Sequence, residues 1–382
     1  MYLRWRSLLR GARCWLLGAP ELSNSLVLLL VLVIKVFDNY REEGEKMLLR
    51  LRYGGAAVLT LLAPEAWALL RFSCSQLVVE RLDPLVNPGV TGTPHLHQII
   101  GGNAFSPSMD PAKVDIPSQA TCTTCTFAED FSNYWAVLYF QARNGTFKRV
   151  PQKGNVGFEQ SNGGMTVYYT PVISGQGKVT AFKPGFRMIV GDPLNRDKSK
   201  VPRQLTFTCL KDPLTRTGET PDFPKAPCPA GIMVNARFPT CWDGKTLDPP
   251  DHSSHVAYPS SGTFESNGPC PASHPVKIPQ LFYEVIWDTT KFNNRADWPE
   301  DGSQPFVWSF GDKTGYGNHA DYVFGWKGNA LQTAMDTNCN INCPQLRSQS
   351  IQQGNQCNVK DIVGDNIDGW LTELPGGMTV DK

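Results

Sequence analysis

Cysteine count constrains the fold of this 382-residue chain more than any other feature. Of its eleven cysteines only Cys14 lies in the first 68 residues, which leaves an even set of ten after them. In a secreted chain an even set predicts five disulfides, which join segments that lie far apart in the sequence. The pairing does not follow from the sequence. The spacings within Cys122–Cys125 and Cys339–Cys343 leave zinc knuckles as an alternative.

Residues 47–68 have the pattern of a secretory signal peptide. A basic start (M-L-L-R-L-R) is followed by an apolar stretch and by A-W-A, a small-x-small cleavage site that ends at Ala68. We therefore interpret residues 1–46 as an upstream extension and residues 69–382 as a single catalytic or binding domain. A signal anchor built from residues 15–34 is the alternative, although its apolar run is short and Lys35 interrupts it.

Charge and targeting signals limit the partners and the location of the mature chain. Removing the nine basic and six acidic residues of the first 68 positions from totals of 36 and 35 leaves 27 basic and 29 acidic residues. Because nucleic-acid binding needs an excess of Lys and Arg, we expect no nucleic-acid partner. We expect a monomeric, secreted, extracellular glycoprotein with no stable membrane span, for which a cell-wall location is an option. The glycosylation sequon at Asn144 agrees with secretion.

Glycine and proline together supply 64 residues, and long helical periodicities are scarce after residue 70. This combination favours short strands with many ordered loops. The sequence predicts a mainly β fold, a single-domain β-sandwich or jelly roll with long disulfide-tied loops. Period-two alternation predicts strands at 134–150 (two strands joined at Arg143-Asn144-Gly145), 165–170, 205–209, 280–288, 305–310 and 320–326, and residues 335–360 predict one short helix with loops.

The clearest predicted strand is 280–288, whose two faces differ. We expect Leu281, Tyr283, Val285 and Trp287 to face the core. The opposite face carries Gln280, Phe282, Glu284, Ile286 and Asp288, a mixture that suggests the floor of a cleft. Glu284 is therefore our best candidate for an acid or base, with a solvated strand face as the alternative. Asp288 shares that face, but about 13 Å of strand is too long for the carboxyl pair of a glycosidase.

All six histidines lie in short polar motifs, which suggests one site assembled from distant segments. The motifs are H-L-H at 95–97, D-H-S-S-H at 251–255, C-P-A-S-H-P around 274 and G-Y-G-N-H-A-D at 315–321. On a strand, His95 and His97 would share a face about 6.6 Å apart and could bind a metal ion or an anionic substrate group. Structural hydrogen bonding is the alternative. The glutamate that follows such a pair in cupins is absent, since Gln98 comes next.

The other two motifs place carboxylates beside imidazoles. Asp251 could orient His252 or His255 as an acceptor, and flanking prolines exclude a helical zincin geometry. A loop held by Asx-type hydrogen bonds is the alternative. Tyr316, His319 and Asp321 form a second combination that could act as acid and base in elimination or glycosidic cleavage.

These motifs resemble a family of secreted fungal proteins defined by a domain of unknown function, DUF1996. The resemblance rests on E-R-L-D-P-L-V-N-P-G at 80–89, H-L-H, D-H-S-S-H-V-A-Y-P at 251–259, C-P with His274, and G-Y-G-N-H-A-D. It covers about residues 74–345. It implies a secreted protein whose relatives are sometimes joined to carbohydrate-associated modules such as WSC, and it implies no reaction.

Together these patterns predict a secreted carbohydrate-active protein that cleaves or binds a cell-wall polysaccharide or oligosaccharide, with hydrolase or lyase chemistry favoured. A metal-dependent oxidase or hydrolase with a multi-histidine site, and a non-catalytic wall or surface protein, are the alternatives. No cofactor is required; a divalent metal ion, if bound, would be held by His95, His97, His255 and His319. The predicted catalytic residues are His97, His255, His319, Asp251, Asp321 and Glu284, and the predicted substrate-binding residues are His95, His252, His274, Tyr316, Asp83 and Asn103.

Overall fold

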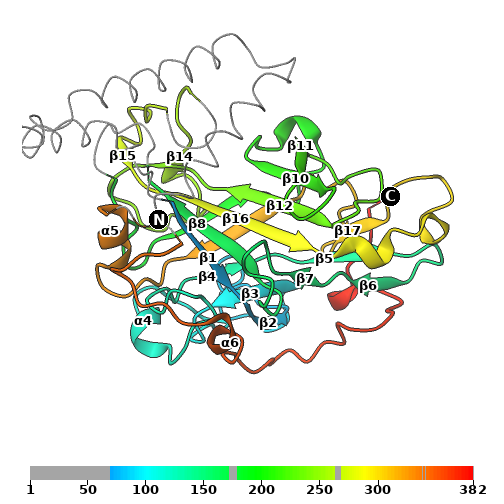
Figure 1. Cartoon of the computed structure of the whole chain (residues 1–382), viewed down its shortest axis with the longest axis horizontal. Helices are drawn as coiled ribbons and strands as arrows, with labels where there is room; N and C mark the ends of the chain where they lie inside the picture. The colour runs from blue at the N-terminus through cyan, green and yellow to red at the C-terminus, as the bar shows by residue number, and fades with distance from the viewer. Residues whose placement is uncertain (1–68, 172–178, 263–267, 338, 340, 382) are drawn as a thin grey trace, which may run out of the picture. The chain divides into compact units, whose positions relative to one another are not determined.

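The computed structural model describes residues 69–171, 179–262, 268–337, 339 and 341–381, all of which belong to one compact unit, Trp67–Lys382 (Figure 1). The predicted upstream extension and signal peptide, residues 1–68, lie outside the described residues. Within the described ranges, no helix combines the length and the apolar character needed to cross a bilayer.

The larger of the two main sheets is antiparallel and seven-stranded, and the long strand β16 lies near its middle (Figure 1). The side chains of β16 alternate between two faces, and both faces are covered, since only Phe282 of the strand is not fully buried. In spatial order its strands are β1 (Leu70–Cys74), β8 (Met165–Thr170), β16 (Gln280–Trp287), β12 (Ile232–Arg237), β10 (Leu205–Leu210) and β11 (Arg216–Thr220), and β7 (Gln152–Lys153) also pairs with β16.

The second main sheet is antiparallel and five-stranded, and it carries the histidines discussed below. Its order is β2 (Gln76–Glu80), β3 (His97–Gly101), β4 (Asn133–Trp135), β18 (His319–Val323) and β9 (Arg187–Gly191). Two smaller sheets are β17 (Phe306–Trp308), β5 (Leu138–Gln141) and β6 (Phe147–Arg149), and β14 (Val256–Ala257), β13 (Cys241–Trp242) and β15 (Val276–Lys277). The described helices are short: α4 (Ile116–Gln119), α5 (Ala330–Met335), α6 (Ile351–Gly354), η1 (Lys198–Lys200), η2 (Thr289–Phe292), η3 (Arg295–Asp297) and η4 (Pro375–Gly377).

The two main sheets pack face to face through buried tyrosines. Tyr169 of the seven-stranded sheet hydrogen-bonds through its hydroxyl to the hydroxyls of Tyr134 and Tyr322 in the five-stranded sheet, each at 3.0 Å. Tyr283 donates its hydroxyl proton to the carbonyl oxygen of Asp321 at 3.2 Å. These bonds satisfy polar groups inside an otherwise apolar core, where an unpaired hydroxyl would be destabilising. The expectation of a mainly β fold is confirmed, and so is the core-facing row of Leu281, Tyr283, Val285 and Trp287.

The observed strands differ from the sequence predictions in several places. The segment 134–150 contains three strands, because β4 joins the five-stranded sheet before β5 and β6 form the expected hairpin around Asn144-Gly145. His319 is the first residue of β18 instead of lying in the preceding turn. Strands β1, β2, β9, β11 and β12 were missed. In β12 all six residues are buried, and Asn235 and Arg237 alternate with apolar residues only in its second half.

All ten described cysteines form disulfides, which confirms the prediction of five bridges. The structure also gives their pairing, which the sequence left open. Cys122 and Cys125 have different partners, so they do not form a zinc knuckle, and Cys339 pairs with Cys343. The bridges are Cys74–Cys125, Cys122–Cys357, Cys209–Cys228, Cys241–Cys270 and Cys339–Cys343. The disulfide between Cys122 and Cys357, which are 235 residues apart in the sequence, links the segment after α6 to the loop beside the five-stranded sheet.

Candidate metal centre

Three of the six histidines converge at one end of the five-stranded sheet. His97 begins β3, His319 begins β18 and His95 lies in the loop before β3. The ring centroids of His95 lie 4.5 Å from His97 and 5.4 Å from His319, and the candidate ligand nitrogens of all three lie within 4.8 Å of one another. His97 is on a strand, but His95 lies in the loop before it, so the expectation that both histidines share one strand face is wrong. The two rings nevertheless approach each other.

Hydrogen bonds to main-chain carbonyls fix two of the imidazoles. His97 donates from Nδ1 to the carbonyl of Leu82 at 2.8 Å, and His319 donates from Nδ1 to the carbonyl of Gly317 at 3.0 Å. A carbonyl oxygen can only accept, so each Nδ1 carries the proton and each Nε2 keeps its lone pair. Metal-binding histidines are oriented in this way by bonds from the second ring nitrogen.

Burial keeps the three rings neutral. It lowers the pKa of His97, lowers that of His95 well below its usual range, and lowers that of His319 to about 4. The neighbouring imidazoles add to the effect for His95 because they would repel a second positive charge. Neutral imidazoles with free lone pairs are the form that binds a metal ion.

The three rings line a small cavity of about 10 Å³, roughly the room that one water molecule needs. Among the described buried atoms, Nε2 of His95 and His97 have no hydrogen-bond partner, and neither do Nδ2 of Asn318 and Nε1 of Trp308 in the same cavity. Buried polar atoms are rarely left unpaired, so this group of acceptors and donors is able to bind a ligand. Its lining also includes Leu96, Ala136, Val137, Ser309 and Phe310.

Two carboxylates face this cluster. Asp321 is buried, and its Oδ2 lies 4.0 Å from Nε2 of His319 without a hydrogen-bond partner among the described residues. Burial, with the negative charge of Asp83 nearby, raises the pKa of Asp321 well above its usual range. Asp83 is also buried, but its Oδ1 accepts from the amides of Leu85 and Val86 and so shapes the loop. Asp321 is therefore the buried carboxylate beside His319, although it is outside the group of converging ligand atoms.

Two glycines allow the backbone to approach the cluster. Gly191 pairs with His319 at φ +88°, where a Cβ would lie 2.2 Å from the carbonyl oxygen of Asn318. Gly317 carries the carbonyl that orients His319, and a Cβ there would lie 2.7 Å from the ring of Phe310. Only glycine permits both contacts.

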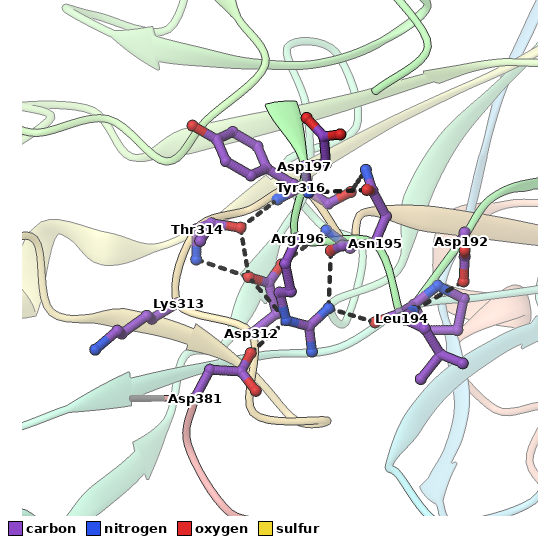
Figure 2. Close-up of polar contacts among 12 residues, drawn as sticks. Asp192, Leu194, Asn195, Arg196, Asp197, Asp312, Lys313, Thr314, Tyr316 and Asp381 are labelled. Atoms are coloured by element: carbon purple, nitrogen blue, oxygen red, sulfur yellow. Dashed lines mark hydrogen bonds and ion pairs between the residues drawn. The ribbon is translucent and has the colours of Figure 1, made fainter. Parts of the chain in front are cut away.

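The turn that leads to His319 is held by a buried carboxylate. Asp312 accepts from the amide of Gly317 at 2.8 Å and from the amide and hydroxyl of Thr314 at 2.7 and 2.6 Å. Figure 2 shows the guanidinium of Arg196 between Asp312 and Asp381. This arrangement places the Gly317 carbonyl where it accepts from His319.

The remaining three histidines lie in the 248–274 loops and have structural contacts. His252 pairs through Nδ1 with Asp248, not with Asp251, because Asp251 accepts from the amides of Ser253 and Ser254. His255 is buried against the ring of Phe186 at 4.9 Å, and neither of its ring nitrogens has a hydrogen-bond partner among the described residues. His274 hydrogen-bonds through Nε2 to the carbonyl of Ser254 at 3.0 Å. None of the three is in the described group of converging nitrogens, so His255 does not join His95, His97 and His319.

Glu284 lies on the opposite face of β16 from Tyr283, which contacts the backbone of Asp321. Its carboxylate accepts from Asn155 and Tyr168, both at 2.6 Å, and from Arg216 at 3.0 Å. The mixed face is therefore a hydrogen-bonded ion-pair cluster, and it places Glu284 away from the three histidines.

Two further predicted residues hold loops. Asn103 accepts through Oδ1 from the amides of Thr121 and Cys122, and the carbonyl of Tyr316 accepts from Asn195. Sequence reasoning missed Asp248, Asp312 and Phe310, whose ring lies 5.1 Å from His95 and 5.2 Å from His319. Only Asp312 had a local signal, since D-K-T followed by glycines is typical of a side-chain-capped turn.

Comparison with known proteins gives one finding. A family model described as a domain of unknown function (DUF1996) matches residues 83–326. No curated protein and no solved structure matches the chain. The matched residues include all six histidines and Asp321.

Proposed function

The chain belongs to the DUF1996 family, a domain of unknown function. From the geometry of its three clustered histidines, we propose that it is a metal-dependent protein. His95, His97 and His319 would hold one divalent transition-metal ion. The single observation that carries the proposal is the convergence of three neutral imidazoles whose nitrogens lie within 4.8 Å of one another. A further support is that Nδ1 of His97 and Nδ1 of His319 already donate to carbonyls.

The donor set favours an ion of intermediate softness. Three imidazole nitrogens suit Zn²⁺ or Cu²⁺ better than Mg²⁺ or Ca²⁺, which prefer oxygen ligands. The carboxylate of Asp321 or one water molecule could take a fourth position, since Oδ2 lies 4.0 Å from Nε2 of His319. Three protein ligands with one remaining position are typical of catalytic zinc sites, where the ion makes bound water more acidic.

The residues around the cavity would orient a small ligand. Nδ2 of Asn318 and Nε1 of Trp308 are unpartnered donors among the described residues of the cavity. They could hydrogen-bond to an oxygen atom that occupies the small space beside the three rings. The cavity volume of about 10 Å³ restricts that ligand to the size of water. Metal-dependent chemistry on a small co-ligand is therefore the function that the geometry supports best.

Metal analysis tests this proposal directly. The untagged chain is stripped with a chelator, reconstituted separately with Zn²⁺ and Cu²⁺, dialysed and measured by plasma mass spectrometry. We expect one ion per chain in wild type and His274→Ala, and less than a tenth of that in His97→Ala. His274 is a matched control because its imidazole already bonds to the carbonyl of Ser254. A wild-type chain that retains no ion from either solution refutes the proposal.

A carbohydrate ligand remains a second candidate, supported by a cavity away from the histidine motifs. This cavity has a volume of about 640 Å³, in the range of ligand pockets. Phe140, Phe292 and the exposed Trp370 supply ring surfaces. Its charged side chains are Arg143, Lys148, Lys291 and Asp297, so positive charge prevails. The combination would suit an acidic oligosaccharide.

Calorimetric titration with oligogalacturonate and with a neutral oligosaccharide of equal length tests this second candidate. We expect heat of binding only with the acidic sugar, and its loss in Trp370→Ala. Leu214→Ala is the control because Leu214 is also exposed but does not line the cavity. Equal or absent binding of both sugars by wild type would exclude the acidic-sugar ligand.

A further inference from the structure

We propose that residues 358–381, which we call the C-terminal strap, position two of the three histidine ligands through two arginines. The strap runs from the end of α6 past β6 and is drawn in orange and red (Figure 1). Asp365 binds Arg81, and Asp381 binds Arg196. The inference rests on the proposed metal site and names residues that hold its geometry without touching the ion.

Arg81 connects the strap to the loop that carries His95. Its guanidinium binds both oxygens of Asp365, with Nε–Oδ2 at 2.6 Å and Nη2–Oδ1 at 3.1 Å. Nη1 donates to the carbonyls of Gly92 and Thr93 at 3.0 and 2.8 Å. The amides of Gly92 and Thr93 in turn donate to the carbonyl of Arg81. Asp365 thus fixes a guanidinium whose other bonds hold the residues just before His95.

A second strap contact reaches the residue next to His95. Gly376 lies so close to this loop that a Cβ on it would be 2.8 Å from the carbonyl oxygen of Pro94 and 3.0 Å from Nη1 of Arg81. The His95 loop is therefore enclosed between the strap and Arg81.

Arg196 connects the strap to the turn that carries His319, as Figure 2 shows. Its Nε binds Asp381 and lies 3.8 Å from Asp312, which accepts from the amide of Gly317. Nη1 of Arg196 donates to the carbonyls of Pro193 and Asn195 at 2.7 and 2.8 Å.

The same arginine also packs beside the aromatic support of the cluster. Cζ of Arg196 lies 5.8 Å from the ring centroid of Phe310, which contacts His95 and His319. The amide of Asp381 donates to the carbonyl of Gly311, next to Phe310, at 3.0 Å. The strap thus acts on His319 through the Gly317 turn and on both rings through Phe310.

The strap contains its own control. Asp368 binds Arg149 on β6, with Nη2–Oδ1 at 2.7 Å, and neither residue belongs to a loop that carries a histidine ligand. This pair is an Asp–Arg ion pair like the other two, but it connects the strap to β6 and not to a loop that carries a histidine ligand. A strap that merely stabilises the fold would use all three pairs alike. A positioning strap would couple only Asp365 and Asp381 to metal affinity.

The test uses the full chain and measures Zn²⁺ affinity by competition with a chromophoric chelator. Asp365→Asn and Asp381→Asn keep side-chain size but remove the charge, and Asp368→Asn is the control. We expect each of the first two to weaken Zn²⁺ binding about tenfold, the lower end for partners that orient metal ligands. The control should retain wild-type affinity. Thermal unfolding of each metal-free variant shows whether the fold is intact.

The possible outcomes separate the two proposals. If wild type binds Zn²⁺ and both strap variants bind it equally well, the positioning role is refuted and the metal site stands. The same conclusion follows if Asp368→Asn weakens binding as much as the other two. If wild type takes up neither Zn²⁺ nor Cu²⁺, the metal site itself is refuted and the strap proposal with it. Partial recovery of affinity in Asp381→Glu would support a charge-dependent contact.

Discussion

Two histidine-rich regions of this molecule use the same side chain in opposite ways. In the cluster of His95, His97 and His319, ring nitrogens converge on one small cavity. In the loops at 248–274, His252 pairs with a carboxylate and His274 with a carbonyl. His252 also has a positive φ of 51°, which no other described non-glycine residue shares.

Protonation separates the cluster from His252 but not from His255, whose pKa burial also lowers. Burial lowers the pKa of the clustered histidines, whereas the hydrogen bond to Asp248 raises the pKa of His252. A neutral imidazole with a free lone pair can bind a cation, and a charged imidazole bound to a carboxylate cannot. Histidine-rich motifs therefore indicate a metal site only where several unprotonated ring nitrogens lie close to one another.

Removing one clustered histidine should produce the largest difference between the regions. We expect His319→Ala to weaken Zn²⁺ binding more than about 100-fold, because even partners that only orient metal ligands account for 10- to 100-fold. His252→Asn should keep wild-type affinity, and asparagine tolerates the positive φ at that position. Competition with a chelator measures both. Similar losses in the two variants would show that the 248–274 loops belong to the same site.

Backbone packing at Gly191 should give the next largest effect. Gly191→Ala would place Cβ 2.2 Å from the carbonyl oxygen of Asn318 and so separate β9 from β18 at His319. We expect unfolding free energy to fall by about 3 kcal/mol or more, from the clash together with the backbone strain. Gly145→Ala is the control, because its φ is +77° but no described atom lies within 4 Å.

Denaturant titration of both variants measures this difference. The control should lose only about 1–2 kcal/mol, the usual strain of a left-handed residue with a Cβ. Zn²⁺ affinity should fall in Gly191→Ala alone. Equal losses of stability in the two variants would mean that close packing at His319 does not matter.

The sequence predicted local features of the fold better than the assembly of the site. Alternation along 280–288 identified the faces of β16, and Asn144-Gly145 identified a hairpin, because both are encoded by neighbouring residues. Strand β12 was missed because its first three residues are all apolar, so polar alternation is confined to its second half.

For the site, the sequence motifs included all three clustered histidines, but they did not show which three of the six histidines would come together. That selection depends on how distant loops pack, such as the contact of Leu82 with His97. The same limit explains why Asp251, and not Asp248, was expected beside His252: adjacency in sequence does not determine which carboxylate the imidazole meets. Glu284 shows a similar limit: alternation placed it opposite the core-facing row, but the expected cleft is a buried cluster whose three donors come from other segments.

His319 and His252 should make the stability of the metal-free protein depend on pH in opposite senses. The pKa of His319 is lowered to about 4, so its contribution is present above the unfolded pKa of about 6.5 and is lost as pH falls through 4. The pKa of His252 is raised, so its contribution is present below about 6.5 and is lost as pH rises through the raised value.

We expect His319→Gln to reduce the loss of stability between pH 6.5 and 4, by up to about 3 kcal/mol at roughly 1.4 kcal/mol per pKa unit. His252→Asn should instead reduce the loss on the alkaline side. Urea unfolding at a series of pH values measures both slopes. If both variants change the unfolding free energy on the same side of about pH 6.5, the assigned protonation states are contradicted.

The smallest expected effect comes from the ion pair of the 248–274 loops. Asp248→Asn removes the charged partner of His252 and of Arg187, whose Nε lies 3.7 Å from Oδ2 of Asp248. We expect a loss of about 1 kcal/mol in unfolding free energy, since a partly exposed, charge-assisted hydrogen bond contributes modestly. Zn²⁺ affinity should stay within about twofold of wild type, because Asp248 contacts no residue of the cluster. A larger fall in affinity would show that the two histidine regions are coupled through β9. This strand contacts both regions, because it pairs with β18 and the amide of its Ile189 donates to the carbonyl of His252.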